Sequence, residues 1–144
     1  MEISMRITLD SSGFIRRECP TCESEFKWFY GETAERPDDF LDPENYFCPY
    51  CGVPAGKDSW WTPTQLEYMA SVAREPVTEE IGRELSGTGF KFSPSPRSEV
   101  AEPPSDPDDM VIVEPPCHPF EPLKILEDRL DRIHCLMCGL VFTV

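Results

Sequence analysis

Six of the seven cysteines lie in three Cys-x-x-Cys pairs, which are Cys19/Cys22, Cys48/Cys51 and Cys135/Cys138. Two residues between the cysteines allow a tight turn, here called a knuckle, that directs both thiolates at one centre. Two knuckles give the four sulfur ligands of a tetrahedron, which is the geometry zinc prefers in structural sites. The first two pairs therefore predict one closed zinc site, with ligands Cys19, Cys22, Cys48 and Cys51.

The remaining cysteines point to a second site near the end of the chain. Cys117 is followed by His118, and His134 directly precedes the pair Cys135 and Cys138. Three cysteines and one histidine predict a second zinc, and thus two Zn²⁺ ions per chain. We favour His118 over His134 as the fourth ligand, because neighbouring side chains on an extended strand diverge. The alternative is a pair of surface histidines beside buried thiols that bind no metal.

Length and cysteine usage constrain the class of protein. The chain has 144 residues, and small ribbons bury too little apolar surface to fold without added stabilisation, such as metal. An odd number of cysteines, mostly at metal spacing, favours reduced thiols and a cytoplasmic location. The first residues lack the basic start and apolar run of a signal peptide, and no stretch approaches the ~20 apolar residues of a membrane helix. We expect a cytoplasmic protein that does not enter membranes.

The charge balance disfavours nucleic acid as a partner. The formal net charge is −14, from 27 acidic and 13 basic residues. Phosphate backbones attract basic surfaces and repel a chain of this sign. Arg16, Arg17 and Lys27 form the one basic group near a knuckle, and three glutamates are interleaved with it. We therefore expect a protein partner, and the acidic surface would suit a basic one.

The first half of the chain has the pattern of a β-ribbon. Residues 3–9 alternate apolar and polar side chains, which predicts a half-buried strand, and residues 10–13 predict a turn. A second strand at 14–18 would deliver the first knuckle. Residues 26–30 are dense in aromatics, which we expect to shield the metal and form the small core. Residues 31–45 are polar and rich in turn formers, so they predict an irregular loop.

A helix is predicted to start after Trp60 and Trp61. Thr62 suits the N-cap, Pro63 the first helical position, and Gln65 completes a capping box. Apolar side chains then follow at helical spacing, at Leu66, Met69, Ala70, Ala73, Val77, Ile81 and Leu85. Pro76 interrupts this stripe, and predicts either a kink or the start of a second helix. The stripe exceeds what two small ribbons could cover, which makes it a candidate protein-docking surface.

These elements predict a small, metal-stabilised α+β fold with two zinc-ribbon-like β modules. The N-terminal ribbon would span 1–61 and the amphipathic helical segment 62–88. A linker rich in proline, serine and acidic residues would span 89–110. The C-terminal module would span 111–144, beginning with a short strand at Val111–Val113.

Several segments resemble a group of bacterial zinc-ribbon proteins. The resemblance rests on the segments 14–22, 26–28 and 48–52, and, for the C-terminal part of that group, on 114–119 and 134–139. The group has no established activity, so the resemblance implies metal binding and adds no mechanism. The Cys-Pro-Tyr-Cys-Gly knuckle at 48–52 also resembles rubredoxin, which holds iron. No glycine follows Cys22, which weighs against an electron-transfer role.

Three functions follow from these observations. The one best supported is a non-enzymatic adaptor with structural zinc, which docks a partner protein through the apolar helix face and aromatic residues. One alternative is a nucleic-acid-binding zinc ribbon. The other is a zinc hydrolase at the second cluster, with an open metal position and Glu121 or Asp128 as the acid–base group. No phosphate loop or His-x-Glu motif supports an enzyme.

Overall fold

A computed structural model describes residues 6–73 and 102–144. The chain divides into two compact units, Met1–Ile7 with Pro63–Ser105, and Thr8–Thr62 with Asp106–Val144. All eight strands found in the described residues lie in the second unit. The described residues thus form a small α+β structure of β-hairpins and one helix, in agreement with the predicted class.

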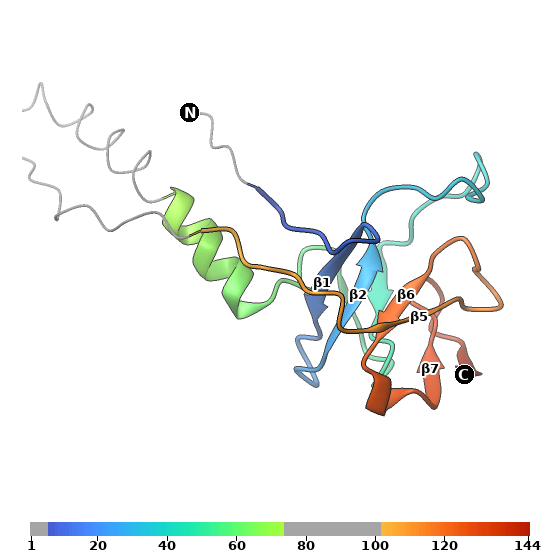
Figure 1. Cartoon of the computed structure of the whole chain (residues 1–144). Coiled ribbons are helices and arrows are strands. Elements are labelled where there is room, and N and C mark those ends of the chain that lie inside the picture. Colours follow the sequence, from blue (N-terminus) through green and yellow to red (C-terminus); the bar gives the residue numbers. More distant parts are fainter. Residues whose placement is uncertain (1–5, 74–101) are drawn as a thin grey trace, which may run out of the picture. The chain divides into compact units, whose positions relative to one another are not determined.

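The main sheet has four antiparallel strands in the order β1-β2-β6-β5 (Figure 1). The strands are β1 (Phe14–Glu18), β2 (Glu25–Phe29), β5 (Val111–Val113) and β6 (Leu123–Ile125). The pairing of β2 with β6 joins two segments that the sequence analysis assigned to separate modules. A lone hairpin buries too little apolar surface to be stable in water, and the added strands supply a larger buried face. The two cysteine-rich halves therefore share one sheet.

Two short hairpins carry the second and third knuckles. β3 (Asn45–Phe47) pairs with β4 (Pro54–Gly56), and β7 (Arg132–His134) pairs with β8 (Val141–Thr143). Each hairpin turns through a Cys-x-x-Cys-Gly sequence, so its two strands hold both cysteines of the pair at one end. A 3₁₀ turn, η1 (Glu127–Arg129), connects β6 to β7.

The core consists of aromatic and aliphatic side chains packed around cysteines. Phe26 of β2 and Trp60 are fully buried, with ring centroids 5.7 Å apart in an edge-to-face contact. The same buried cluster includes Cys19, Cys48 and Cys135. The aromatic stretch at 26–30 thus contributes to the core beside the knuckles, as predicted. Edge-to-face packing adds about 0.5–1.5 kcal/mol per pair beyond the buried area.

A row of basic side chains crosses the sheet. Arg16, Lys27 and Lys124 are cross-strand partners on β1, β2 and β6. Asp106–Asp109, here called the acidic strap, pairs with all three. Its shortest ion pairs are Lys124 Nζ to Asp108 Oδ1 at 2.6 Å, Arg16 Nη2 to Asp109 Oδ1 at 2.6 Å, and Lys27 Nζ to Asp106 Oδ1 at 2.9 Å. The last part of the predicted acidic linker is therefore bound to the sheet.

Asp10 completes the charge network from the turn before β1. Its Oδ2 lies 3.0 Å from Lys27 Nζ and 2.7 Å from Lys124 Nζ, and all three side chains are buried. Its Oδ1 accepts hydrogen bonds from the backbone amides of Ser12 and Phe14. One carboxylate therefore closes the predicted turn and pairs with two buried ammonium groups.

The predicted strand at 3–9 is wrong for the residues that the structure describes. Residues 6–10 belong to no strand. The backbone amide of Arg6 donates to the Tyr68 hydroxyl at 3.2 Å, and the amide of Asp10 donates to the carbonyl of Phe14. These amides bond to a side chain and to a turn, so they are not available for a strand ladder. Residues 1–5 lie outside the described residues.

The helix begins at Pro63, as predicted, and is described to residue 73. Its buried side chain is Tyr68, whereas Leu66 is 51% exposed and Ala70 is exposed. The predicted interruption at Pro76, the rest of the apolar stripe and residues 89–101 of the linker lie outside the described residues. Within the described residues, no helix has the length and apolar character needed to cross a membrane.

Candidate metal centres

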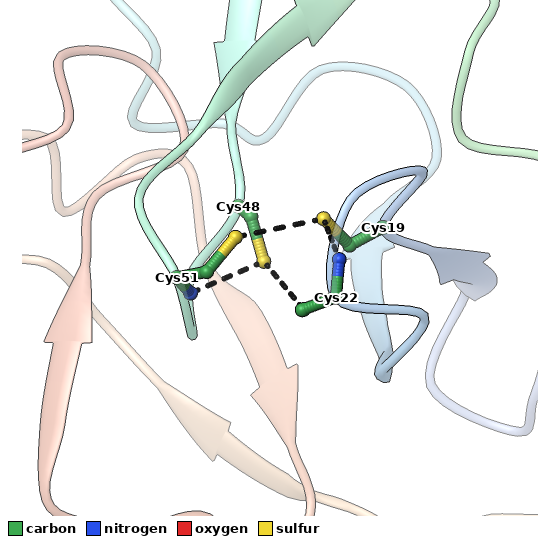
Figure 2. Close-up of side chains that lie close together, drawn as sticks. All are labelled: Cys19, Cys22, Cys48 and Cys51. Carbon is green, nitrogen blue, oxygen red and sulfur yellow. Dashed lines mark hydrogen bonds between the residues drawn. The ribbon is translucent and has the colours of Figure 1, made fainter.

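The first candidate centre is formed by the first two knuckles (Figure 2). The Sγ atoms of Cys19 and Cys51 lie 3.7 Å apart, and those of Cys22 and Cys48 also lie 3.7 Å apart. All four sulfurs lie within 4.8 Å of one another. A tetrahedral zinc with bonds of ~2.3 Å places its sulfurs ~3.8 Å apart. The four cysteines are free thiols whose spacing fits one tetrahedral metal ion.

Backbone amides surround the sulfurs of the first centre. Cys19 Sγ accepts hydrogen bonds from the amides of Thr21 and Cys22, at 3.3 and 3.4 Å. Cys48 Sγ accepts the equivalent bonds from the residues two and three positions further along, at 3.4 and 3.5 Å. Such donors orient a metal ligand and offset part of the negative charge of a thiolate. The hydrogen bonds within each knuckle thus orient both sulfurs and make them suitable ligands for a cation.

All three knuckles close with the same backbone turn. The amides of Glu23, Gly52 and Gly139 each donate to the carbonyl of the first cysteine of their pair, at 2.9 Å. These residues have φ of +59°, +74° and +76°. Glu23 thus adopts the left-handed conformation that glycine adopts in the other two knuckles, at a cost of about 1–2 kcal/mol. The missing glycine after Cys22 therefore leaves the turn unchanged and does not separate zinc from iron.

The second candidate centre brings together Cys117, His118, Cys135 and Cys138. Cys117 Sγ lies 3.5 Å from Cys138 Sγ, and Cys135 Sγ lies 3.5 Å from His118 Nδ1. A tetrahedral zinc with Zn–N of ~2.0 Å and Zn–S of ~2.3 Å separates nitrogen from sulfur by ~3.5 Å. The four ligand atoms lie within 4.8 Å of one another, so they also fit one metal ion.

His118, the favoured fourth ligand, enters this group through a turn. Its amide donates to the carbonyl of Pro115 at 3.1 Å, and its carbonyl accepts from the amide of Glu121 at 3.0 Å. His134 is not in the group. Its ring packs against Gly52, and its Nδ1 lies 3.1 Å from the carbonyl oxygen of Gly139.

The second and third knuckles contact each other by two equivalent hydrogen bonds. The amide of Phe47 donates to the carbonyl of Leu136 at 2.9 Å, and the amide of His134 donates to the carbonyl of Pro49 at 2.8 Å. Phe47 and His134 each directly precede the first cysteine of their knuckle. The two hairpins therefore bond reciprocally, and this contact links the two candidate centres. The sequence predicted the Cys-x-x-Cys pairs but not this contact between them.

The electrostatics of the sulfurs favour a bound cation. Burial raises the pKa of the Cys48 thiol, and raises the pKa of Cys135 to about 12. Burial also raises the pKa of Cys22, but hydrogen bonds from the backbone and side chain of Ser24 outweigh it and lower that pKa to about 7. Buried thiolates without a counter-charge are unfavourable. A divalent metal ion supplies that charge, so the donor chemistry fits the predicted cofactor.

The acid–base residues of the hydrolase alternative lie outside the ligand groups. Glu121 pairs with Arg36 at 3.1 Å, and burial raises the pKa of its carboxyl. Asp128 is an exposed residue of η1. Neither residue belongs to the group of ligand atoms at the second centre.

Comparisons with protein-family models, with curated proteins and with solved structures found no match. The resemblance to bacterial zinc-ribbon proteins therefore stays a prediction. The fold and the two cysteine groups define the class of protein, which is a small α+β chain with two groups that could each hold a metal ion.

Proposed function

We propose that both groups hold Zn²⁺ and that the two zinc ions are structural. The observation that carries this proposal is that each group supplies four protein ligand atoms within 4.8 Å of one another. Four protein ligands fill the tetrahedral shell of a structural zinc, whereas catalytic zinc keeps a position open for water or substrate. Three of the cysteines, Cys19, Cys48 and Cys135, are fully buried within the core cluster. Metal binding is thereby coupled to folding.

A non-enzymatic role follows from the same closed shells. A hydrolase at the second centre would need His118 or one cysteine to leave the metal so that water could bind. It would also need a free carboxylate near the metal, but Glu121 is paired with Arg36. We therefore propose no catalytic residue among the residues that the structure describes.

X-ray absorption at the zinc edge tests the closed shells directly. One S₄ site and one S₃N site average to about 3.5 sulfur and 0.5 nitrogen ligands per zinc, with Zn–S near 2.3 Å. His118→Ala should leave the sulfur count unchanged and replace the nitrogen by a water oxygen. His134→Ala is the matched control and should leave the spectrum unchanged. A wild-type spectrum with a water ligand or five-coordinate zinc would contradict the structural role.

The functional part of the proposal is an adaptor role, in which the chain docks a partner protein through the helix at 63–73. Leu66 is 51% exposed and Ala70 is exposed on this helix, while Met69 is partly buried. Amphipathic helices commonly dock through such side chains. The net charge of −14 suits a basic partner, which it would attract most strongly at low salt.

The double variant Leu66→Asp/Met69→Asp tests this docking surface. We expect it to lose a partner that co-purifies with the tagged wild-type chain, while both zinc ions remain bound. Glu67→Gln changes an exposed position on the same helix and is the control, which should keep the partner. Retention of the same partner by the double variant would contradict docking through this helix.

Four of the nine basic residues that the structure describes are engaged by carboxylates, which disfavours the nucleic-acid alternative. Arg16 pairs with Glu25 at 3.1 Å and with the acidic strap, and Arg36 pairs with Asp42 at 3.0 Å. Lys27 and Lys124 are buried beneath carboxylates. Each phosphate contact needs an accessible cation, and side chains that are paired with carboxylates are not accessible to phosphate.

A further inference from the structure

A pocket of about 270 Å³ lies in the second unit, walled by both halves of the chain. Its wall includes Arg17 of β1, Trp28 of β2, Tyr46 of β3, Glu121, and the knuckle residues Leu136 and Met137. The wall is thus apolar on the side of the third knuckle and carries charged groups elsewhere.

Arg17 is the unusual residue of this wall. Its side chain stacks between two tryptophans, with the guanidinium carbon 4.3 Å from the ring centroids of both Trp28 and Trp61. The residue is only 6% exposed, and its Nε is buried without a hydrogen-bond partner. Among the described residues, no carboxylate lies within ion-pair distance of Arg17. Burial accordingly lowers the pKa of this guanidinium to about 10.

The other arginine of the same wall shows the contrast. Arg36 pairs with Glu121 at 3.1 Å and with Asp42 at 3.0 Å, so it has carboxylate partners within the protein. A buried cation without a counter-charge is costly, because it has lost its hydration and gained no partner. Stacking on two tryptophans recovers part of that cost. An anion in the pocket would supply the missing partner.

We propose that this pocket binds a small organic monocarboxylate, with the carboxylate on Arg17 and an apolar body against Trp28, Leu136 and Met137. The planar guanidinium matches a carboxylate in a two-point contact. The volume lies just below the ~300 Å³ at which drug-sized pockets begin, so the ligand is small. Because Leu136 and Met137 lie between two ligands of the second centre, the pocket wall needs that knuckle to be folded.

Charge selects a monoanion over a phosphate. Among the described residues that line the pocket, Arg17 is the arginine without a carboxylate in ion-pair distance, and a monoanion would pair with it. Glu32, Asp42 and Glu121 also line the pocket. These carboxylates would repel any anion, and they would repel the doubly charged phosphate monoester more strongly than a monocarboxylate. We therefore expect a dianion to bind more weakly than a carboxylate of similar size.

Benzoate, benzamide and phenyl phosphate can each be titrated into the full zinc-loaded chain. The NMR signals of the backbone amides and tryptophan indoles then report binding. We expect saturable shifts of the Trp28 and Trp61 indole signals with benzoate, at a Kd below about 5 mM. Benzamide has nearly the same shape without the charge and should bind at least tenfold more weakly, as should phenyl phosphate. A benzoate Kd above about 5 mM, or equal binding of either comparison compound, would overturn the proposal.

Variants of Arg17 test the assigned contact. Arg17→Met keeps an apolar chain between the tryptophans and should weaken benzoate binding at least tenfold, whereas Arg17→Lys should weaken it less. Arg129→Met is the matched control, because Arg129 also stacks on an aromatic ring, 4.3 Å from Tyr50, outside this pocket. Unchanged benzoate affinity in Arg17→Met would exclude the contact. If Arg17→Met does not fold, the comparison of benzoate with benzamide on the wild type still tests whether binding needs the carboxylate.

Discussion

At the scale of single residues, two glycines control how the knuckles pack. A β-carbon at Gly52 would lie 2.7 Å from the ring of His134, and one at Gly139 would lie 2.9 Å from the ring of Phe47. Real β-carbons do not approach neighbouring atoms so closely. Both glycines also have positive φ, so side chains are disfavoured there on two grounds.

Alanine at these glycines should therefore cost more than backbone strain alone. We expect Gly52→Ala and Gly139→Ala each to lower the free energy of unfolding by about 2–4 kcal/mol, from the left-handed backbone and the clash together. Gly31→Ala is the control, because Gly31 has φ of +107° but no atom within 4 Å of the added carbon. It lacks the clash and should lose less than either of the other variants, by the backbone strain alone of about 1–2 kcal/mol, in denaturant titrations. Equal losses at all three positions would exclude the proposed ring contacts.

At the scale of elements, the acidic strap and Asp10 hold a basic row against the sheet. Asp10→Asn keeps an oxygen for the turn amides but removes the charge shared by Lys27 and Lys124. We expect a loss of about 3–5 kcal/mol of unfolding free energy, as for other broken buried ion pairs. Asp108→Asn should cost much less, because this carboxylate is half-exposed and solvent screens its pair with Lys124. A small loss for Asp10→Asn would show that the lysines find other partners.

The pH dependence of this contribution has a definite sign. Burial would raise the pKa of Asp10, but hydrogen bonds from Lys124, the amide of Phe14 and Lys27 hold it well below its usual range. A depressed carboxyl pKa stabilises the fold above the unfolded value of ~3.9 and loses that effect as the pH falls below it. The stability gap between wild type and Asp10→Asn should therefore stay constant from pH 5 to pH 8. A gap that narrows within this window would contradict the assignment.

We expect the contact between the second and third knuckles to couple the two candidate centres. Because Phe47 and His134 exchange backbone hydrogen bonds with the opposite knuckle, loss of metal from one centre should loosen the other. In Cys138→Ser we expect a chelator to remove zinc from the first centre about tenfold faster than in the wild type. An unchanged release rate would show that the two centres are independent.

At the scale of the whole molecule, local patterns in the sequence predicted the knuckles, the turn before β1 and the start of the helix. The spacing of the cysteines was enough to predict that Cys19 and Cys51 share one site, because a tetrahedral metal site needs the ligands of two Cys-x-x-Cys pairs. The pairing of β2 with β6 could not be predicted, since Lys27 and Lys124 are far apart in sequence. The acidic strap was missed for the same reason, because Asp106 is recognisable as a partner only once the basic row is assembled.

We propose that two structural zinc ions stabilise the fold of this chain. Native mass spectrometry of the protein purified without added metal tests this proposal most directly. We expect a mass that corresponds to two zinc ions and no disulfide. Removal of the metal should abolish the dispersed NMR spectrum, because metal binding supplies folding energy in small domains. One zinc per chain would remove the second centre. Iron, or a metal-free chain that keeps its fold, would contradict the claim.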